Sequence, residues 1–244
     1  MTIAGKSTIV VGASRGLGRG IATAFAQAGA SVVAVARSAA PLAELAESIH
    51  PELLDAREAV APGSIFDRHA PEIVVLVAGA TPLMAPLQEQ TWETFSVNWD
   101  TDVRIAFHWL REALRRPLPP GSRVVVVSSG AARAGSPLSG GYAGAKATQR
   151  FMTAYAQGEA DRAGLGITFT TVLPKLTPLT GLGRPAVQAY AARSGQTEEA
   201  YLQRMGAPLT PEIAGAALVE LVGADAAPAA PGYLLTAEGL QPLP

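Results

Sequence analysis

The stretch Ser7-Thr-Ile-Val-Val-Gly-Ala-Ser-Arg-Gly-Leu-Gly18 joins a β-branched run to a glycine-rich turn. Residues 7–11 have the composition of a strand buried on both faces. After the turn, apolar residues recur at helical spacing, namely Leu17, Ile21, Phe25 and Ala28. Gly29 is placed to end that helix in a left-handed conformation, and residues 31–36 read as a second strand. Together these segments predict one βαβ unit, whose turn opens a helix N-terminus toward a phosphate.

The glycines follow the spacing Gly12-x-x-x-Gly16-x-Gly18. Gly12 and Gly16 would let the backbone approach a cofactor, and Gly18 would let the helix pack close to the strand. A glycine-rich turn alone marks any tight turn. Bracketed by a strand and a helix, it predicts a dinucleotide-binding site.

Two arginines bear on which dinucleotide binds. Arg15 lies inside the turn, and Arg37 follows the second strand, where an NAD enzyme would place an acid for the ribose 2′-hydroxyl. A cation there suits a 2′-phosphate, so the sequence favours NADP(H) over NAD(H). The alternative for Arg37 is a solvated loop charge.

Composition narrows the class of protein. The chain has 244 residues, 16% of them charged, and a net charge of −1, which offers no field for nucleic acid or an acidic membrane surface. The absence of cysteine excludes disulfides and thiolate metal sites. Three histidines are scattered without ligand spacing, so no metal site is predicted: His50, His69 and His108. The first strand follows closely on the N-terminus and no apolar run approaches about 20 residues, so we expect a cytoplasmic protein without signal peptide or membrane span.

The remaining pattern predicts alternating strands and helices in one domain, residues 1–244. Helices are expected over 41–49, within 56–71, and over 92–116, 142–163 and from 211 onward, and strands over 52–54, 73–77, 124–127, 167–173 and 232–236. Thr210 is the expected N-cap of the last helix. The irregular span of about 176–209 is interpreted as an apolar-lined lid over a substrate, with a mobile surface loop as the alternative.

The helix expected over 92–116 carries an apolar stripe that should pack on the sheet, formed by Val103, Phe107, Leu110 and Leu114. Exposed aromatic surface such as Trp109 would suit a subunit interface. The neighbouring Arg104, Arg111 and Arg115 are interpreted as a solvated rim.

Chemistry is expected in the stretch from Ser128 to Lys146, which follows a strand and enters a helix. Tyr142 and Lys146 are four residues apart and share a helix face. A lysine ammonium held there would stabilise a phenolate and lower the tyrosine pKa, so that Tyr142 can exchange a proton near neutral pH. Ser129 lies on the loop that ends the strand, where its hydroxyl can bind the same substrate oxygen. An incidental Tyr and Lys at a helix start is the alternative.

Three further positions are candidates. Asp55 ends the third strand and could accept from an adenine amino group, although a turn-forming Asp would look the same. Ala78-Gly79 provides small residues past which the cofactor could run. Asn98 stands inside a helical pattern, either as a functional group or as a packed polar side chain.

This constellation resembles the short-chain dehydrogenase/reductase family, in its compact single-domain branch, along the whole chain. The resemblance rests on Gly12-x-x-x-Gly16-x-Gly18, Asp55, Ala78-Gly79, Asn98, Ser129, Tyr142-x-x-x-Lys146, Pro174 and the closing strand before Gly239. It implies an α/β fold, a Rossmann-type, doubly wound, seven-stranded parallel sheet with helices on both faces, and the ligand at the carboxyl ends of the strands.

The resemblance also implies residue roles. Tyr142 would be the general acid or base, Ser129 would polarise the substrate carbonyl, and Lys146 would hold the nicotinamide ribose and lower the Tyr142 pKa. Asn98 would anchor a water chain to Lys146. The implied cofactor-binding residues are Gly12, Ser14, Arg15, Gly16, Leu17, Gly18, Arg37, Asp55, Ala78, Gly79, Tyr142, Lys146, Pro174 and Thr177.

Two departures from the family pattern stand out. The family's Asn-Asn before Ala78-Gly79 is here Leu76-Val77. Lys175 stands after Pro174, where the family pattern has a glycine. Its side chain either pairs with cofactor phosphates or an acidic substrate, or points to solvent. Thr177 is expected to offer its backbone to the carboxamide.

The resemblance implies an NADP(H)-dependent oxidoreductase acting on a carbonyl or secondary alcohol of a small, partly apolar substrate, as a homodimer or homotetramer. No nucleic acid or membrane partner is expected. One alternative is an NADP-binding redox sensor without turnover. Another keeps the enzyme but changes the chemistry to epimerisation or to oxidation of a hydroxylated ring.

Overall fold

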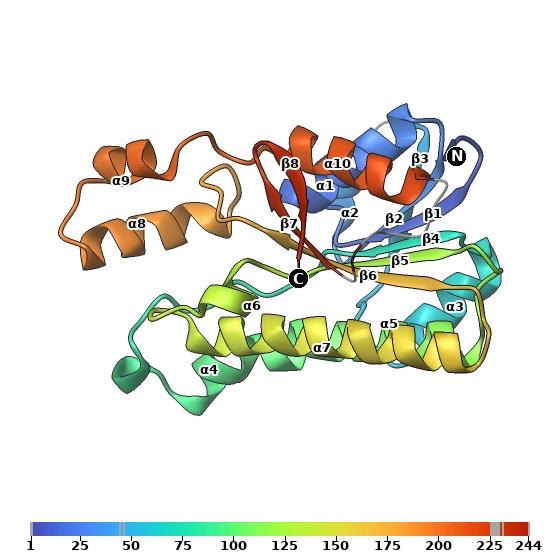
Figure 1. The fold of residues 1–244 in the computed structure, drawn as a ribbon, viewed down its shortest axis with the longest axis horizontal. Helices are drawn as coiled ribbons and strands as arrows, with labels where there is room; N and C mark the ends of the chain where they lie inside the picture. The colour runs from blue at the N-terminus through green and yellow to red at the C-terminus, as the bar shows by residue number, and fades with distance from the viewer. Residues whose placement is uncertain (1, 44, 46, 225–229, 231, 244) are drawn as a thin grey trace.

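The computed structural model describes residues 2–43, 45, 47–224, 230 and 232–243. Across these residues the strands form one eight-stranded sheet in the order β3-β2-β1-β4-β5-β6-β7-β8 (Figure 1). The strands are β1 Ser7–Val11, β2 Ser31–Ala36, β3 Ile49–Leu53, β4 Ile73–Leu76, β5 Arg123–Val127, β6 Thr168–Pro174, β7 Gly232–Thr236 and β8 Gly239–Pro242. The order reverses between β1 and β4, which is the point where doubly wound sheets bind ligands.

The predicted seven-stranded parallel sheet is correct except at its end. β1 to β7 pair in parallel, but β8 adds an antiparallel edge strand to β7. A short turn joins the two strands, with Thr236 opposite Gly239, whose φ of +107° suits glycine. The sequence of β8, Gly-Leu-Gln-Pro, contains no β-branched run and therefore does not predict a strand.

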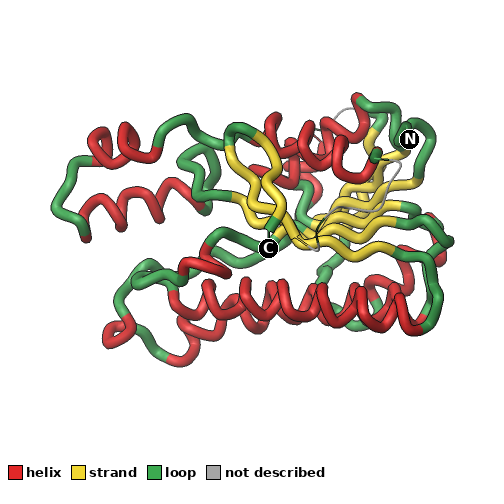
Figure 2. Tube along the Cα trace, in the orientation of Figure 1, coloured by secondary structure: helices red, strands yellow, loops and turns green. Residues whose placement is uncertain are grey.

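Helices cover both faces of the sheet, as Figure 1 shows and Figure 2 repeats by secondary structure. The helices are α1 Gly16–Gln27, α2 Ala39–Ala43, α3 Ala61–His69, α4 Trp92–Asn98, α5 Arg104–Arg115, α6 Ala131–Ala134, α7 Gly140–Arg162, α8 Gly183–Arg193, α9 Glu198–Met205 and α10 Pro211–Gly223. A 3-10 turn spans Leu87–Glu89, and a π-helical segment spans Trp99–Val103. α1 and α10 pack on one face, and α3, α5 and α7 lie on the other (Figure 1).

The core lies in two layers because successive strand residues point to opposite faces. Val10 of β1 packs with Phe25 of α1 and Leu218 of α10 in one buried cluster. Ile9 and Trp109 belong to the cluster on the other side. Both faces of the central strands are therefore apolar, as their Val-rich sequences predict.

Several local predictions are confirmed. β1, β2 and β7 have the predicted bounds, and Gly29 ends α1 with a φ of +85°. The Thr210 hydroxyl accepts a hydrogen bond from the backbone N of Ile213 at 3.2 Å and caps α10. The helix predicted over 41–49 is the shorter α2, and β3 begins at Ile49 rather than Glu52; Glu44 and Ala46 of that prediction lie outside the described residues.

The helix predicted over 92–116 consists of α4, the π segment and α5, and its packing prediction is wrong in two places. Trp109 is 1% exposed and donates its indole N–H to the Ala56 carbonyl at 3.1 Å, whereas Phe107 is 50% exposed. Leu110 and Leu114 of the predicted stripe pack in the same core cluster as Trp109, as expected. The helix therefore does carry an exposed aromatic side chain, but it is Phe107 and not Trp109.

The span 176–209, called the lid segment below, contains α8 and α9 and is less irregular than predicted. In Figure 1 both helices extend beyond the sheet on the side of α4 and α6. Among the described residues, no helix combines the length and the apolar character that crossing a membrane requires.

Candidate active site

A cavity of about 840 Å³ opens at the carboxyl ends of the strands. Its walls come from the β1–α1 turn, the ends of β2 to β6, the start of α7 and the lid segment. Of the residues predicted to form the site, all except Asn98 line this cavity. The topology thus brings together residues that are spread over most of the sequence.

The glycine-rich turn is packed so closely that side chains would not fit. The backbone N of Gly12 donates to Val35 O at 2.9 Å, and Gly12 has a φ of +97°. A Cβ at Gly12 would lie 2.6 Å from Ala78 N, and one at Gly18 would lie 2.2 Å from Gly12 O. The close packing of Gly18 agrees with its predicted role, whereas the approach of Gly12 to a cofactor stays a prediction.

The turn also leaves the start of α1 open to a ligand. Arg15 is the N-cap, its side chain makes no capping hydrogen bond, and no acidic residue stands in the first turn. The free N–H groups and the positive end of the helix dipole suit an anion. Ser14 and Leu17 line the cavity beside this helix start.

Cations gather at the end of the cavity formed by β2 and β3. Arg15 and Arg37 are exposed and line it. Arg57, which the sequence analysis did not single out, lines it too and donates to both carboxylate oxygens of Asp55, with Nη2 2.6 Å from Oδ2. Its hydrogen bonds hold the Asp55 pKa at about 2, below its ordinary 3.8. Asp55 is thus an ionised group oriented by its neighbour two residues on.

The three residues expected to touch the substrate oxygen or its proton donor also line this cavity. Ser129 follows β5, and its Oγ accepts from Ala131 N at 3.2 Å, which leaves the hydroxyl proton available. Tyr142 and Lys146 lie one helical turn apart on α7, and Nζ of Lys146 is 5.5 Å from the centroid of the Tyr142 ring.

Lys146 has a buried partner that the sequence analysis missed. Its Nζ lies 3.0 Å from Oδ2 of Asp102, which is 0% exposed, and donates to Oε1 of Gln149 at 3.0 Å. Burial works to lower the Lys146 pKa, but the attraction of Asp102 and Tyr142 outweighs it and raises the pKa above its ordinary value. No local signal in the sequence marks this pairing, because Asp102 lies in the π-helical segment and Lys146 in a distant helix.

Asn98 is completely buried behind the cavity rather than on its wall. Its Nδ2 donates to Ala80 O at 2.8 Å and to Asp102 Oδ1 at 3.2 Å, while its Oδ1 has no partner among the described residues. Asn98 therefore connects to Lys146 through Asp102.

The end of the cavity near β6 combines Pro174, Lys175 and Thr177. Lys175 is exposed, and its Nζ donates to Met205 O at 3.4 Å, at the carboxyl end of α9. The Thr177 hydroxyl donates to Leu209 O, so that side chain ties the two ends of the lid segment together. At the position of the missing asparagines, the N atoms of Val77 and Ala78 both donate to Val11 O at 2.9 Å.

The lid segment contributes aromatic side chains to the cavity wall. Leu182, Tyr190 and Tyr201 line the cavity, whereas Leu179 is exposed. The Tyr190 hydroxyl shares a hydrogen bond with Ser136, which shares another with Ser139 at 2.7 Å. A polar chain thus runs from α8 to the start of α7.

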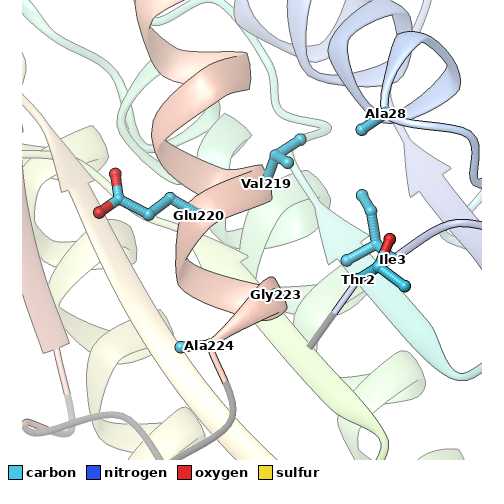
Figure 3. Close-up of a pocket in the computed structure, with 7 residues that line it drawn as sticks. All are labelled: Thr2, Ile3, Ala28, Val219, Glu220, Gly223 and Ala224. Atoms are coloured by element: carbon cyan, nitrogen blue, oxygen red, sulfur yellow. The ribbon is translucent and has the colours of Figure 1, made fainter.

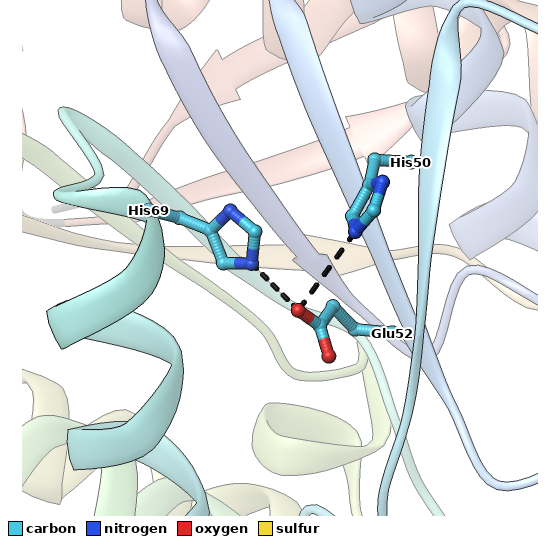
Figure 4. Close-up of side chains that lie close together, drawn as sticks. All are labelled: His50, Glu52 and His69. Carbon is cyan, nitrogen blue, oxygen red and sulfur yellow. Dashed lines mark hydrogen bonds and ion pairs between the residues drawn. The ribbon is translucent and has the colours of Figure 1, made fainter.

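Two features lie outside this cavity. Figure 4 shows His50 and His69 around Glu52, with His69 Nε2 2.7 Å from Glu52 Oε1, so two histidines that look scattered in sequence meet in space. Arg68 also donates to both oxygens of Glu52, at 3.1 and 2.9 Å, which makes an ion-pair cluster. A smaller pocket of about 410 Å³ lies near the N-terminal end of β1, between Ile3, Ala28 and Val219 (Figure 3).

Comparison with known proteins agrees with the fold. The family model of the short chain dehydrogenases matches residues 6–191, so the chain belongs to this family. A short-chain dehydrogenase/reductase from a Cladobotryum species is 33% identical over 162 residues, covering 61% of this chain and 62% of the relative. An NADPH-dependent pterin aldehyde reductase from Arabidopsis thaliana is 30% identical over 59% of this chain.

The matched stretches span less than two thirds of these curated relatives, 62% and 64% of their length. Among solved structures, a short chain dehydrogenase from Burkholderia cenocepacia in complex with NADP superposes with a TM-score of 0.72 at 20% identity. That likeness covers 96% of this chain and 89% of the other, and it supports the fold.

Proposed function

We propose that this protein is an NADP(H)-dependent oxidoreductase that reduces a carbonyl of a small, partly apolar molecule, or oxidises the corresponding secondary alcohol. The observation that supports the proposal is the shared cavity, which is lined by Ser129, Tyr142 and Lys146 as well as by the glycine-rich turn. Relatives named as reductases, such as the NADPH-dependent pterin aldehyde reductase, support the same reaction class.

The cavity fits a dinucleotide phosphate. The α1 N-terminus offers uncapped N–H groups, and a Cβ at Gly12 or Gly18 would meet backbone atoms closer than 3 Å away. In the proposal, Arg15 and Arg37 hold the 2′-phosphate and Asp55 lies at the adenine. Ala78, Gly79, Pro174 and Thr177 lie along the path to the nicotinamide, whose ribose Lys146 holds.

When bound, the nicotinamide supplies or takes the hydride. The chain supplies the rest: Ser129 donates a hydrogen bond to the carbonyl oxygen, and Tyr142 gives that oxygen its proton. Lys146, which lies one helical turn after Tyr142 on α7, orients the tyrosine side chain. Asn98, with its unpartnered Oδ1, anchors a water on the route by which protons return.

The lid segment selects the substrate in this account. Leu182 and Tyr201 give it an apolar wall, and the Tyr190–Ser136–Ser139 chain gives it a polar one. A substrate with one carbonyl on an otherwise apolar body matches both walls.

The first experiment follows NADPH and NADH consumption with a panel of ketones and aldehydes, alongside thermal shifts with NADP and NAD. We expect turnover with at least one carbonyl and stronger stabilisation by NADP. Stabilisation by NAD alone would remove the role given to Arg15 and Arg37. Tight NADPH binding without hydride transfer to any carbonyl of the panel would favour a second candidate function.

That second candidate is an NADP-binding sensor without turnover. Lys175 favours it, since a cation near the nicotinamide end departs from the family pattern and contacts α9 rather than a catalytic group. The arrangement of Ser129, Tyr142 and Lys146 argues against it, because a sensor needs no proton donor.

Assembly into a homodimer or homotetramer is part of the proposal. α5 and α7 pack together and carry exposed aromatic side chains, with Phe107 50%, Phe151 58% and Tyr155 67% exposed. A surface of this kind suits burial against a second copy.

A further inference from the structure

A carboxylate stands directly behind the catalytic lysine. Asp102, in the π-helical segment between α4 and α5, is 0% exposed, and its Oδ2 lies 3.0 Å from Nζ of Lys146. Its other oxygen, Oδ1, accepts from Ala80 N at 2.8 Å and from Asn98 Nδ2 at 3.2 Å. Two hydrogen-bond donors and an ammonium group thus surround this buried carboxyl group.

Gln149 closes the arrangement from α7. Its Oε1 accepts from Lys146 Nζ at 3.0 Å, and its Nε2 donates to the backbone O of Asp102 at 2.9 Å. An ammonium has three protons to donate. Nζ donates one of them to Gln149 and forms an ion pair with Asp102, whose Oδ2 accepts no hydrogen bond within the described residues.

The backbone nearby is shaped around this carboxylate. A Cβ at Gly79 would lie 2.7 Å from Asp102 Oδ2, so the glycine leaves the space that the carboxylate fills. Asp102 and Gly79 both line the cavity. The ion pair is therefore built into the cavity wall rather than being a chance contact.

The charge of the pair matters for Tyr142. A lone lysine cation stabilises a phenolate nearby, whereas a cation paired with a carboxylate exerts a much weaker field on it. Asp102, from the π segment, and Tyr142, from the same helix, are the groups whose attraction raises the Lys146 pKa. Asp102 is thus the group able to offset the lysine charge.

We propose that Asp102 is a positioning residue that compensates the charge of Lys146 and so keeps Tyr142 protonated to higher pH than a lone lysine would. The inference deepens the proposed function and rests on it for the role of Tyr142. A tyrosine kept protonated is suited to reduction, in which the carbonyl carbon takes the hydride from NADPH and the carbonyl oxygen takes the phenol proton. Solvent then returns that proton to the phenolate, and NADP leaves oxidised.

The experiment titrates the phenolate absorbance of the protein without any substrate. The chain has five tyrosines, so the titration of Tyr142→Phe is subtracted to isolate Tyr142. In Asp102→Asn we expect the Tyr142 signal to appear about one to three pH units lower than in the wild type, because the lysine charge is no longer offset. The pH above which the rate of carbonyl reduction by NADPH declines should fall by a similar amount.

Asp67→Asn is the matched control. It removes a carboxylate from an exposed ion pair with Arg116, at 2.7 Å, and should leave the Tyr142 titration unchanged. An unchanged titration in folded Asp102→Asn would overturn the inference.

Asp102→Asn could unfold the protein by leaving a lysine charge buried alone, so a second variant carries the test. Asp102→Asn combined with Lys146→Met removes both charges, and we expect its Tyr142 signal to return to the wild-type midpoint. A midpoint well above the wild type would show that the lysine acts uncompensated, and would contradict the inference. Since neither titration needs turnover, failure of the proposed reductase activity is seen separately, as a lack of NADPH consumption.

Discussion

A methyl group at Gly79 would lie 2.7 Å from Oδ2 of Asp102, a separation at which one of the two must move. We therefore expect Gly79→Ala to displace the carboxylate from Lys146 and to lower the free energy of unfolding by about 1–3 kcal/mol, as overpacking does. Urea denaturation measures this change.

Gly158→Ala is the control for that measurement. Gly158 is exposed on α7, and a Cβ there meets nothing within 4 Å. The substitution should raise the free energy of unfolding by about 0.5–1 kcal/mol, since alanine favours a helix. An equal free energy of unfolding for Gly79→Ala and the wild type would show that the packing around Asp102 has room for a methyl group.

The cofactor assignment predicts a selective loss in Arg37→Ala. Removing a charge-assisted contact of about 1.5–3 kcal/mol should weaken NADP binding roughly 10- to 100-fold. NAD has no 2′-phosphate, so its affinity should stay the same. Titration calorimetry with both dinucleotides tests this, and an equal loss for NAD would place Arg37 elsewhere on the cofactor.

The Asp55–Arg57 pair predicts a pH-dependent stability. Because the folded-state pKa of Asp55 is lowered from 3.8 to about 2, its contribution is present above pH 4 and is lost as the pH falls toward 2. The pair is partly exposed, so solvent screening reduces the contribution to about 1 kcal/mol. Asp55→Asn should be less stable than the wild type at pH 6, and the two should converge in acid.

Urea unfolding at a series of pH values between 6 and about 2 provides the measurement. Asp67→Asn serves as the reference, because it removes a more exposed ion pair and should lower the free energy of unfolding by a smaller amount. A constant gap between Asp55→Asn and the wild type across this range would mean that the pair does not act through ionisation.

The exposed aromatic surface predicts assembly through α5 and α7. Phe151 is 58% exposed and stacks with Tyr155 at 6.4 Å between ring centroids. Phe151→Glu should shift the mass measured by light scattering toward the monomer, because a charge would be buried at the interface. Leu53→Glu, on the edge strand β3, should not. A wild-type monomer would rule out this surface as a stable interface.

The sequence predicts the parts of the fold that depend on local pattern. The β1–α1–β2 unit follows from valine runs, helical spacing and Gly29, and each forms as expected. The positions of Ser129, Tyr142 and Lys146 follow from the strand-to-helix stretch, and the topology brings them to the cavity with the glycine turn.

The sequence does not predict contacts that depend on which helix face turns inward. Trp109 and Phe107 are both apolar and two residues apart, and packing against Ala56 decides that Trp109 is buried. Asp102 looks like a surface acid in the sequence, yet a π-helical segment places it against Lys146. Such pairings join segments far apart in the chain, so local pattern carries little information about them.

The central claim is that Tyr142 gives a proton to a carbonyl oxygen beside bound NADPH. The most direct measurement compares turnover and NADPH binding in the wild type and in Tyr142→Phe, which keeps the ring and removes the hydroxyl. We predict that kcat falls about 100-fold or more while the NADPH dissociation constant stays near the wild-type value. Unchanged kcat in Tyr142→Phe, with a carbonyl that the wild type reduces, would contradict the account.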